Sequence, residues 1–316
     1  MNQSPIVAVI GDVNVDLVFV VPTFPTEGDD VSATSLAWLS GGAGLNIAVA
    51  LARLGAQVRL IARVGTDPAA EVALQSAVEA GVDLRFVQRD EHYVTGMCTA
   101  MVGAAGERTF VCFRGANLQL DAATLKAALA DVKLLAVSGH ALVESRQRAT
   151  TLHALALAKH NGVAVALDLC PPLIRAHRTE LHTLLPLLRL ITLNEYEAQL
   201  FLPHLESAQI PGHLLASGAA CAALKKGSHG CTLAQGSDYI CALPPTVQAI
   251  DSTGCGDAFS AALIWGLLHS ANLPDCATFA NTCGALTATR PGAAAAIPDR
   301  QALKAQLSPS LHYLVS

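Results

Sequence analysis

The chain has 316 residues, of which 52% are hydrophobic and 14% are charged, and its formal net charge at pH 7 is -5. This negative balance, without any basic cluster interleaved with aromatic residues, argues against nucleic acid as the main partner. Because no apolar run approaches the length of a membrane span and the residues from Met1 to Pro5 carry no basic charge, we expect a cytoplasmic protein without a membrane partner.

The first predicted element is a buried parallel strand. It consists of the apolar run Ile6–Ile10 and is closed by Gly11. The polar residues Asp12, Asn14 and Asp16 follow in alternation with apolar residues. Since ligands of open α/β sheets bind beyond the carboxyl ends of the strands, these three side chains are candidates for contacts with sugar hydroxyls. A solvated edge strand with the same alternation is the other interpretation.

Residues 17–39 have a strand-like pattern interrupted by prolines, which indicates part of a small β-sheet that stands off the main body. The glycine-rich stretch 41–46 comes next and leads into a predicted helix over 47–54, which Gly55 ends. The stretch lacks the third glycine of a Rossmann fingerprint and the G-K-[ST] end of a Walker loop. Taken alone, it predicts only the entrance of a helix.

A strand over 58–64 and a helix over 69–80 precede a hairpin with strands at 95–102 and 108–113 and a turn at 103–107. Together with the earlier strand-like segment, this hairpin would form a small sheet that covers the substrate. We expect one face of that sheet to be apolar, with Phe19, Val21, Met101, Phe110 or their neighbours. A second copy of the chain would cover such a patch, which predicts a homodimer through the lid. A hairpin folded on its own core is the alternative.

The chain then alternates between helices and strands. We predict a helix capped by Asp121 and running to Ala130, a strand over 134–137, a helix over 145–160, a strand over 163–169, a helix over 179–188, and strands over 190–193 and 222–224. Such alternation implies a parallel sheet that is covered by helices on both faces.

Asn194 and Glu197 follow the strand over 190–193 and open a helix. Two residues at this spacing lie on one face of a helix and could act on a ligand together. An N-cap asparagine with a glutamate that completes a capping box is a strong alternative.

The segment Asp251–Asp257 (DSTGCGD) precedes an apolar helix over 258–268. A helix start offers free backbone N–H groups and the positive end of the dipole, so it stabilises an anion such as phosphate. The carboxylate of Asp257 at this place would repel the anion, so its presence suggests a functional role. Accepting a proton from a hydroxyl that attacks a phosphoryl group is one such role. An N-cap role for Asp257 is equally compatible with the spacing.

Nine cysteines are scattered along the chain, and none forms a C-x-x-C pair. This spacing is weak support for a zinc or redox site. Free buried thiols in a reducing compartment are the better interpretation.

DSTGCGD resembles the signature of the ribokinase/PfkB-like carbohydrate kinase family, in which alanine is usual at the position of Cys255. The segments GDVNVD at 11–16 and GGAGLN at 41–46 resemble two further motifs of that family, in the family's order. Residues Gly65 and Asp67 match a structural element, and the resemblance extends from Gly11 to Pro298. It implies an α/β ribokinase-like fold, a mostly parallel sheet with helices on both faces and a small β-sheet lid.

The resemblance also assigns roles. It implies that Asp257 is the catalytic base, and that the backbone amides of Gly254, Cys255, Gly256 and Asp257 form the anion hole. It places the acceptor against Asn14, Asp16, Gly42 and Asn46, and ATP against Asn194, Lys225, Gly227, Gly254, Gly256 and Asn281, with Lys226 as the other candidate lysine. It implies that Glu197 acts on Mg²⁺ through water and that Asp251, with the loop over 289–298, holds a possible monovalent cation such as K⁺. Asn281 lies in a predicted helix over 279–288, and Asp168 keeps a possible role on the substrate side.

We therefore expect one ribokinase-like α/β domain over 1–316, with lid segments at about 13–40 and 94–116. The expected activity is an ATP-dependent, magnesium-requiring phosphotransfer to a hydroxymethyl group of a sugar or sugar-like substrate. Ribokinases usually carry lysine at the position of Ala43 and glutamate near Gly139 and His140, so these residues count against ribose. The Lys225 loop favours fructose or a sugar acid such as ketodeoxygluconate. A nucleoside kinase of the same family and a non-catalytic sugar-binding regulatory protein are the alternatives.

Overall fold

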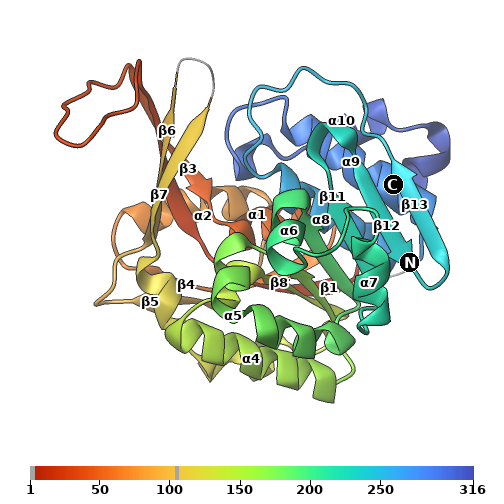
Figure 1. Ribbon diagram of the computed structural model, residues 1–316. Helices are drawn as coiled ribbons and strands as arrows, with labels where there is room; N and C mark the ends of the chain where they lie inside the picture. The colour runs from red at the N-terminus through yellow and green to blue at the C-terminus, as the bar shows by residue number, and fades with distance from the viewer. Residues whose placement is uncertain (1–3, 104–106) are drawn as a thin grey trace.

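Two β-sheets of different size organise the molecule (Figure 1). The computed structural model describes residues 4–103 and 107–316. Within these residues, the larger sheet has nine strands in the order β13-β12-β11-β10-β9-β8-β1-β4-β5, and the smaller sheet has four in the order β3-β2-β6-β7. The strands from β11 to β5 run parallel, and only β12 and β13 are antiparallel to their neighbours. The predicted fold class is confirmed.

The strands of the larger sheet are β1 (Ile6–Ile10), β4 (Gln57–Gly65), β5 (Val87–Asp90), β8 (Leu134–Ser138), β9 (Ala164–Asp168), β10 (Leu190–Asn194), β11 (Cys221–Lys225), β12 (Cys231–Gln235) and β13 (Asp238–Ala242). The principal helices are α1 (Ala43–Leu54), α2 (Ala69–Glu79), α3 (Leu125–Ala128), α4 (Ser145–His160), α5 (Pro171–Leu184), α6 (Glu195–Phe201), α7 (Ile210–Ala216), α8 (Cys255–Leu268), α9 (Leu273–Thr287) and α10 (Arg300–Gln306).

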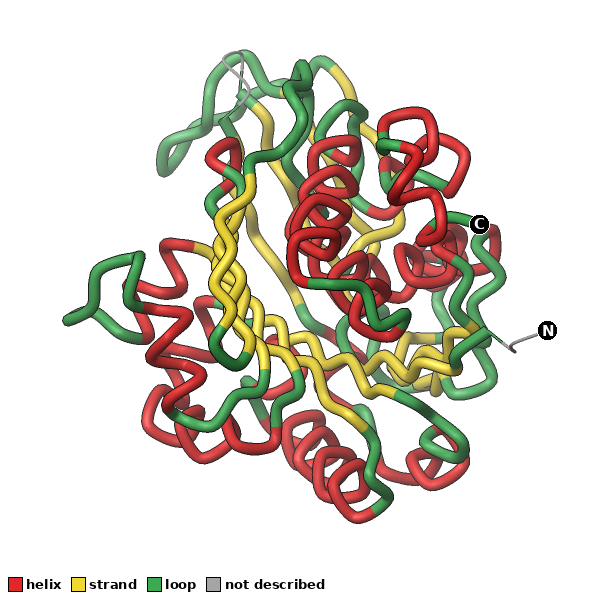
Figure 2. The backbone as a smooth tube through the Cα atoms, turned by 90° about the vertical axis from the view of Figure 1, so that its right-hand side faces the viewer, coloured by secondary structure: helices red, strands yellow, loops and turns green. Residues whose placement is uncertain are grey.

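Each central strand is buried on both faces, so each face needs its own layer of helices. In β1, Val7 and Val9 belong to a core shared with α1, α2, α8 and α9, whereas Ala8 and Ile10 belong to a core shared with α3 to α7. Figure 2 shows helices on both sides of the strands. No helix in the described part of the chain is long and apolar enough to cross a membrane.

The smaller sheet, which we call the lid sheet, consists of β2 (Asn14–Val20), β3 (Ser35–Gly41), β6 (Gly96–Val102) and β7 (Arg108–Phe113). Figure 1 shows its strands rising at the upper left of the molecule. The predicted hairpin of 95–102 and 108–113 is thereby confirmed, and residues 104–106 of its predicted turn lie outside the described residues.

Side chains alternate between the two faces of the lid sheet. Asp16, Cys98 and Cys112 are cross-strand neighbours and lie on the face that we call the inner face, together with Arg108. Phe19 and Met101 lie on the opposite, outer face. The expectation that Phe110 shares their face is wrong, because Phe110 pairs with Ala100, one position out of phase.

Three predicted helices begin earlier in the structure. Helix α1 starts at Ala43 rather than at 47, because Gly44 allows the helix to lie against Gly11, where a side chain would come within 2.5 Å of the backbone. Helices α5 and α9 start at Pro171 and Leu273, because proline fits the first turn of a helix, where its missing N–H costs nothing. The predicted helix after Asp121 is a short 3-10 turn followed by the four residues of α3.

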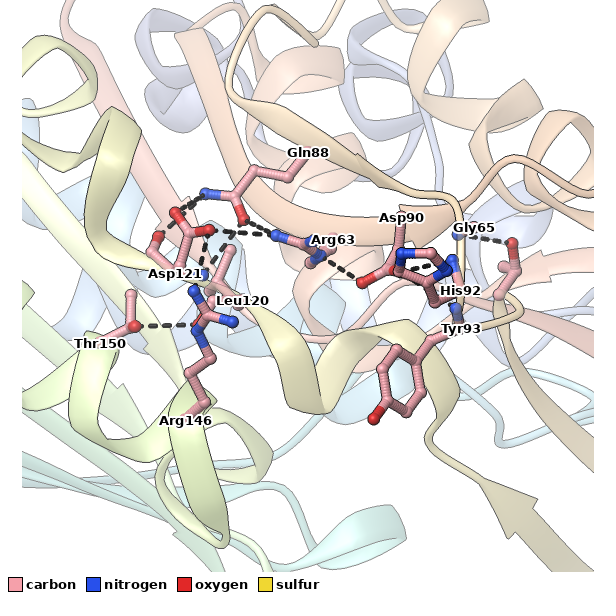
Figure 3. Close-up of polar contacts among 11 residues, drawn as sticks. Arg63, Gly65, Gln88, Asp90, His92, Tyr93, Leu120, Asp121, Arg146 and Thr150 are labelled. Carbon is pink, nitrogen blue, oxygen red and sulfur yellow. Dashed lines mark hydrogen bonds and ion pairs between the residues drawn. The ribbon is translucent and has the colours of Figure 1, made fainter.

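A polar network fixes β5 to the larger sheet. The Arg63 Nε atom donates to Asp90 at 2.7 Å, and its Nη1 atom lies 3.2 Å from the Asp121 carboxylate (Figure 3). The other Asp90 oxygen accepts the backbone N–H groups of His92 and Tyr93. Both oxygens of this buried carboxylate are therefore matched by donors.

Candidate active site

The DSTGCGD segment, residues 251–257, leads into α8 and forms its first turn. Gly254 is the N-cap and has a φ of 77°, a left-handed conformation that favours glycine. The Cys255 amide lies 3.3 Å from the Ser252 carbonyl oxygen. The amides of Gly256 and Asp257 belong to the first turn, where a helix offers no internal acceptor. An anion would meet these two amides first.

Helices α1 and α8 meet at a hydrogen bond between residues far apart in the sequence. Asn46 Nδ2 donates to Asp257 Oδ2 at 2.7 Å. Asn46 Oδ1 is buried and has no hydrogen-bond partner among the described residues. A buried acceptor of this kind is costly unless a ligand satisfies it, so Asn46 is well suited to accept a hydrogen bond from a bound hydroxyl group.

The Asp257 carboxyl group titrates near neutrality. Burial raises its pKa to about 7, and the negative charge of Asp168 acts in the same direction. The hydrogen bond from Asn46 and the charge of Lys225 oppose this rise. A carboxylate with a pKa near neutrality is a better proton acceptor than an ordinary aspartate at physiological pH.

The base of the lid sheet brings the predicted acceptor residues to the start of α1. A side-chain atom at Gly41 would lie 2.1 Å from Asp16 Oδ2, so the carboxylate lies directly on the Gly41 backbone. Burial raises the pKa of Asp16 to about 7, with smaller contributions from Cys112 and Asp251. Asn14 accepts from Asn117 Nδ2 at 2.9 Å, which fixes its orientation.

Gly42 is the N-cap of α1 and has a φ of 95°. A Cβ atom there would lie 2.5 Å from the Asp12 carbonyl oxygen. Asp12 in turn accepts from both Arg114 and Gln147. Glycine is therefore required at this position for the backbone itself as well as for the approach of a ligand.

A cavity of about 560 Å³ lies on the other side of the α8 terminus. The predicted nucleotide residues that line it are Asn194, Lys225, Gly227, Gly256 and Asn281; the lining also includes Cys255 and apolar groups such as Val247 and Phe259. Gly254 and Lys226 are not among the lining residues. Asn281 also donates to the Ala242 carbonyl oxygen at 2.9 Å, so it fixes α9 to the end of β13.

Lys225 occupies the boundary between the cavity and the anion-binding turn. Its Nζ atom lies 2.6 Å from Asp168 Oδ1 and would lie 3.4 Å from a Cβ atom at Gly256. Burial disfavours its charge, but the carboxylates of Asp168 and Glu197 outweigh burial and raise the pKa of Lys225. Asp168 also accepts from Thr192 and Ser260. The structure thus gives Asp168 a defined contact, with the lysine.

Asn194 and Glu197 form the capping box that was the alternative interpretation. Asn194 Oδ1 accepts the Glu197 N–H and Glu197 Oε2 accepts the Asn194 N–H, each at 2.8 Å. Burial raises the pKa of Glu197 to about 7 while the charge of Lys225 opposes the rise. In the described part of the chain, no three His, Cys, Asp or Glu side chains converge closely enough to hold a metal ion.

The sequence patterns missed the role of Arg108. This residue of β7 donates from the lid sheet to the Asp251 carboxylate and to the Thr253 hydroxyl. Asp251 also accepts the N–H groups of Thr253 at 2.7 Å and Gly292 at 2.8 Å. Although burial opposes ionisation, these hydrogen bonds hold the pKa of Asp251 below its usual range. A basic residue on the inner face of the hairpin was the available signal.

The arrangement can perform one kind of chemistry well. A buried carboxylate with a raised pKa lies beside backbone amides that favour an anion, and a lysine lies at the mouth of an apolar cavity. The carboxylate can accept a proton from an attacking hydroxyl, while the amides and the ammonium group stabilise the charge that moves onto a phosphoryl group.

Comparisons with known proteins agree with this geometry. The family model described as pfkB family carbohydrate kinase matches residues 5–300. The chain is 29% identical to a ribokinase of Haemophilus influenzae over 303 residues, which covers 93% of this chain and 95% of the relative. It is 30% identical to a fructokinase of Escherichia coli over 292 residues, which covers 84% of this chain and 91% of the relative. A solved structure of Arabidopsis thaliana ribokinase, complexed with ribose and ATP, matches 99% of both chains with a TM-score of 0.82 and 23% identity.

Proposed function

The chain belongs to the pfkB family of carbohydrate kinases and transfers a phosphoryl group from ATP to a sugar; from that premise we propose a role for each group of the site. Asp257 accepts the proton of the attacking hydroxymethyl group. The amides of Gly256 and Asp257 stabilise the transferred phosphoryl group, with those of Gly254 and Cys255 completing the turn. The observation that carries this proposal is the Asn46–Asp257 pair, which joins the acceptor side of the site to the phosphate side.

The acceptor binds between the lid sheet and α1. The free Asn46 Oδ1 accepts one sugar hydroxyl, Asp16 takes another, and Gly42 allows the sugar to approach the backbone. Asn14 orients the base of the lid sheet through Asn117. Closure of the lid sheet excludes water, which would otherwise compete with the sugar for the phosphoryl group.

The nucleotide binds in the 560 Å³ cavity, whose volume lies in the range of small-ligand sites. Asn194, Gly227 and Asn281 contribute to its wall, and Lys225 faces the phosphates. When bound with ATP, Mg²⁺ would neutralise phosphate charge. Asp168 and Glu197, whose charges act on Lys225, are the carboxylates that would hold the waters of this ion.

We propose a neutral sugar of the fructose type as the acceptor, ahead of a sugar acid or a sugar phosphate. The cations on the substrate side, Arg114 and Arg108, are each paired with an aspartate, Asp12 and Asp251, so neither offers an uncompensated positive charge for an anionic substrate. Ala43 lacks the lysine side chain that ribokinases usually carry, which favours an acceptor other than ribose.

The test is release of ADP with magnesium-ATP and a panel of fructose, ribose, other neutral sugars, sugar acids, sugar phosphates and nucleosides. We expect turnover with fructose or a related neutral sugar. Turnover with a sugar acid, a sugar phosphate or a nucleoside alone would overturn the assignment of the substrate. No turnover with any acceptor, with ATP still bound, would favour a binding protein.

The outer face of the lid sheet supports a homodimer. Its apolar side chains Trp38, Val111 and Phe113 are 51%, 63% and 59% exposed. We propose that a second copy of the chain covers this patch through its own lid sheet. Sedimentation that finds only monomers at micromolar concentration would remove the proposal.

Arg108 supplies the positive charge beside Asp251, so a monovalent cation such as K⁺ is not the partner of that carboxylate in this chain. We expect wild-type turnover to be alike in K⁺ and Na⁺. The Arg108→Met variant should lose about tenfold or more in kcat/KM, because it leaves a buried carboxylate without its charged hydrogen bond. Added K⁺ should then restore part of the rate and raise the melting temperature.

The matched control for this experiment is Arg85→Met, which removes an exposed arginine paired with Asp83 two residues away. This variant should have the same kcat/KM as the wild type and the same dependence of turnover on K⁺ and Na⁺. Strong K⁺ activation of the wild type, with no further dependence in Arg108→Met, would contradict the assignment.

A further inference from the structure

Two of the scattered cysteines lie opposite each other in the lid sheet. Cys98 of β6 and Cys112 of β7 are directly paired across the antiparallel ladder, and their sulfur atoms lie 2.8 Å apart. Directly opposed residues in such ladders have Cα atoms about 4.5–5.5 Å apart. This spacing lies within the range that a disulfide bridge requires. All nine cysteines are free thiols, as expected, but Cys98, Cys112, Cys241 and Cys255 are not buried.

The two thiols differ in reactivity. Cys112 is exposed and Cys98 is half-buried. The two sulfur atoms share one hydrogen bond, in which either can be the donor. This contact and the positive charge of Arg114 lower the pKa of Cys112, and the same contact, together with burial, raises the pKa of Cys98. Because Cys112 is the more exposed thiol, it reacts first, and Cys98 is the second thiol beside it.

The other cysteines lack this combination. Cys170, Cys221, Cys231, Cys276 and Cys283 are buried, and burial raises the pKa of each. Cys241 is exposed but lies opposite Thr232 rather than another cysteine. Burial raises the pKa of Cys255 to about 12. Among the described cysteines, the pair in the lid sheet is the one that combines access, a reactive thiolate and a partner.

The pair also lies on the inner face of the lid sheet. Cys98 is the cross-strand neighbour of Asp16, and the charge of Cys112 contributes to the raised pKa of Asp16. Arg108, which contacts Asp251, is on the same face of β7 as Cys112. The thiols therefore face the region where we place the acceptor sugar.

We propose that Cys98 and Cys112 form a dithiol site that exchanges with small-molecule disulfides to give an intramolecular disulfide. The Cys112 thiolate attacks one sulfur of the small disulfide, forms a mixed disulfide and releases one thiolate. Cys98 then gives up its proton to solvent, attacks the Cys112 sulfur and releases the second small thiol. The two protein sulfurs lose two electrons, and the small disulfide gains them.

Oxidation changes the acceptor side of the site. It removes a thiolate next to Asp16 and ties β6 to β7 on the inner face, where a sugar must fit. We therefore expect the disulfide form to bind the acceptor several-fold more weakly, and a bound acceptor to slow the exchange several-fold. This part rests on the proposed function, whereas formation of the disulfide does not.

The experiment incubates the reduced protein with oxidised glutathione and follows intact mass and peptide mass. We expect a product lighter by two hydrogen atoms, a crosslinked peptide pair containing residues 98 and 112, and full reversal by dithiothreitol. The Cys98→Ser variant should instead accumulate glutathione on Cys112. Cys241→Ser is the control and should form the crosslink as the wild type does.

Stable glutathione adducts on wild-type Cys112, or a crosslink between other cysteines, would overturn the proposal. A crosslink that forms at the same rate with and without an accepted sugar would overturn its placement over the acceptor. The mass measurement does not require turnover. If the proposed sugar is wrong, the experiment still shows whether Cys98 and Cys112 form a disulfide.

Discussion

The Asp257→Asn variant is expected to lose about 10³-fold in kcat while becoming more stable than the wild type above pH 7. The loss follows because an amide cannot accept the hydroxyl proton, a contribution of about 10²- to 10⁴-fold for a general base. Binding of ATP should be nearly unchanged, because the backbone of the first turn of α8 is unaltered. Steady-state kinetics and nucleotide binding by calorimetry measure the two quantities.

The gain in stability follows from the raised pKa of Asp257. Burial lifts this pKa from 3.8 to about 7, so the ionised side chain destabilises the folded state at pH values above 7. That penalty shrinks as the pH falls through 7 and is gone below the unfolded value near 3.8. Asparagine carries no charge, and its side-chain oxygen can still accept the hydrogen bond from Asn46. At pH 8 the free energy of unfolding of the variant should therefore exceed that of the wild type by a few kcal/mol.

Asp90→Asn is the matched control, because Asp90 is a buried aspartate with the opposite electrostatics. Burial opposes its ionisation, but hydrogen bonds from His92, Tyr93 and Arg63 lower its pKa (Figure 3). Its amide variant should therefore lose about 3 kcal/mol of stability at pH 7 and keep its kcat. Equal turnover by Asp257→Asn and the wild type would end the assignment of the base.

The activity of the wild type should also depend on pH through the ionisation of Asp257. Asp257 must be ionised to accept a proton, and its pKa is about 7. We expect kcat/KM to fall about tenfold per pH unit below this value and to level off above it. The acidic limb should disappear from the residual activity of Asp257→Asn, and a limb that persists there unchanged would point to Asp16 instead.

Lys225→Met should lose about 10²-fold in kcat, and it should also be less stable than the wild type. The rate falls because a positive charge is removed from the path of the phosphoryl group. Stability falls because the variant leaves the carboxylate of Asp168, only 11% exposed, without its cation, which costs about 3–5 kcal/mol for a buried pair. Kinetics and thermal unfolding separate the two effects.

The double variant Lys225→Met with Asp168→Asn distinguishes a catalytic lysine from one that only balances charge. It removes both members of the ion pair, so most of the stability should return. The rate should stay low, because the phosphate side still lacks its ammonium group. Recovery of kcat together with stability would mean that Lys225 serves only to neutralise Asp168.

Local signals in the sequence were sufficient for much of the fold and for the outline of the site. The buried strand β1 is a continuous apolar run, β8 and β10 are mostly apolar, and glycine-rich starts indicated α1 and α8. The segments that follow β1 and β10 carry predicted site residues such as Asn14 and Asn194, since parallel strands bring their carboxyl ends to one edge of the sheet. Asn46 and Asp257 were both identified, although their contact was not.

The remaining features depend on contacts between distant segments. The Lys225–Asp168 pair and the Arg108–Asp251 pair each join elements far apart in the chain, and sequence spacing does not predict these contacts. The Cys98–Cys112 pair is different, because the predicted hairpin already places residue 98 opposite residue 112. The predicted helix over 279–288 starts six residues too late, because α9 begins at Leu273 with Pro274 in its first turn, where proline is accepted. Lys226 was the other candidate lysine, and the structure separates the two, because Lys225 lines the cavity and contacts Asp168 whereas Lys226 does not line it.

The hydrogen bond between Asn46 and Asp257 spans 211 positions of the chain. Closing so long a loop is entropically costly, so we expect this contact to form late in folding rather than in its nucleus. During synthesis, the lid sheet and the first strands leave the ribosome well before α8 exists. We therefore expect a nascent chain to form the lid sheet and the first strands before Asp257, in the first turn of α8, can meet Asn46.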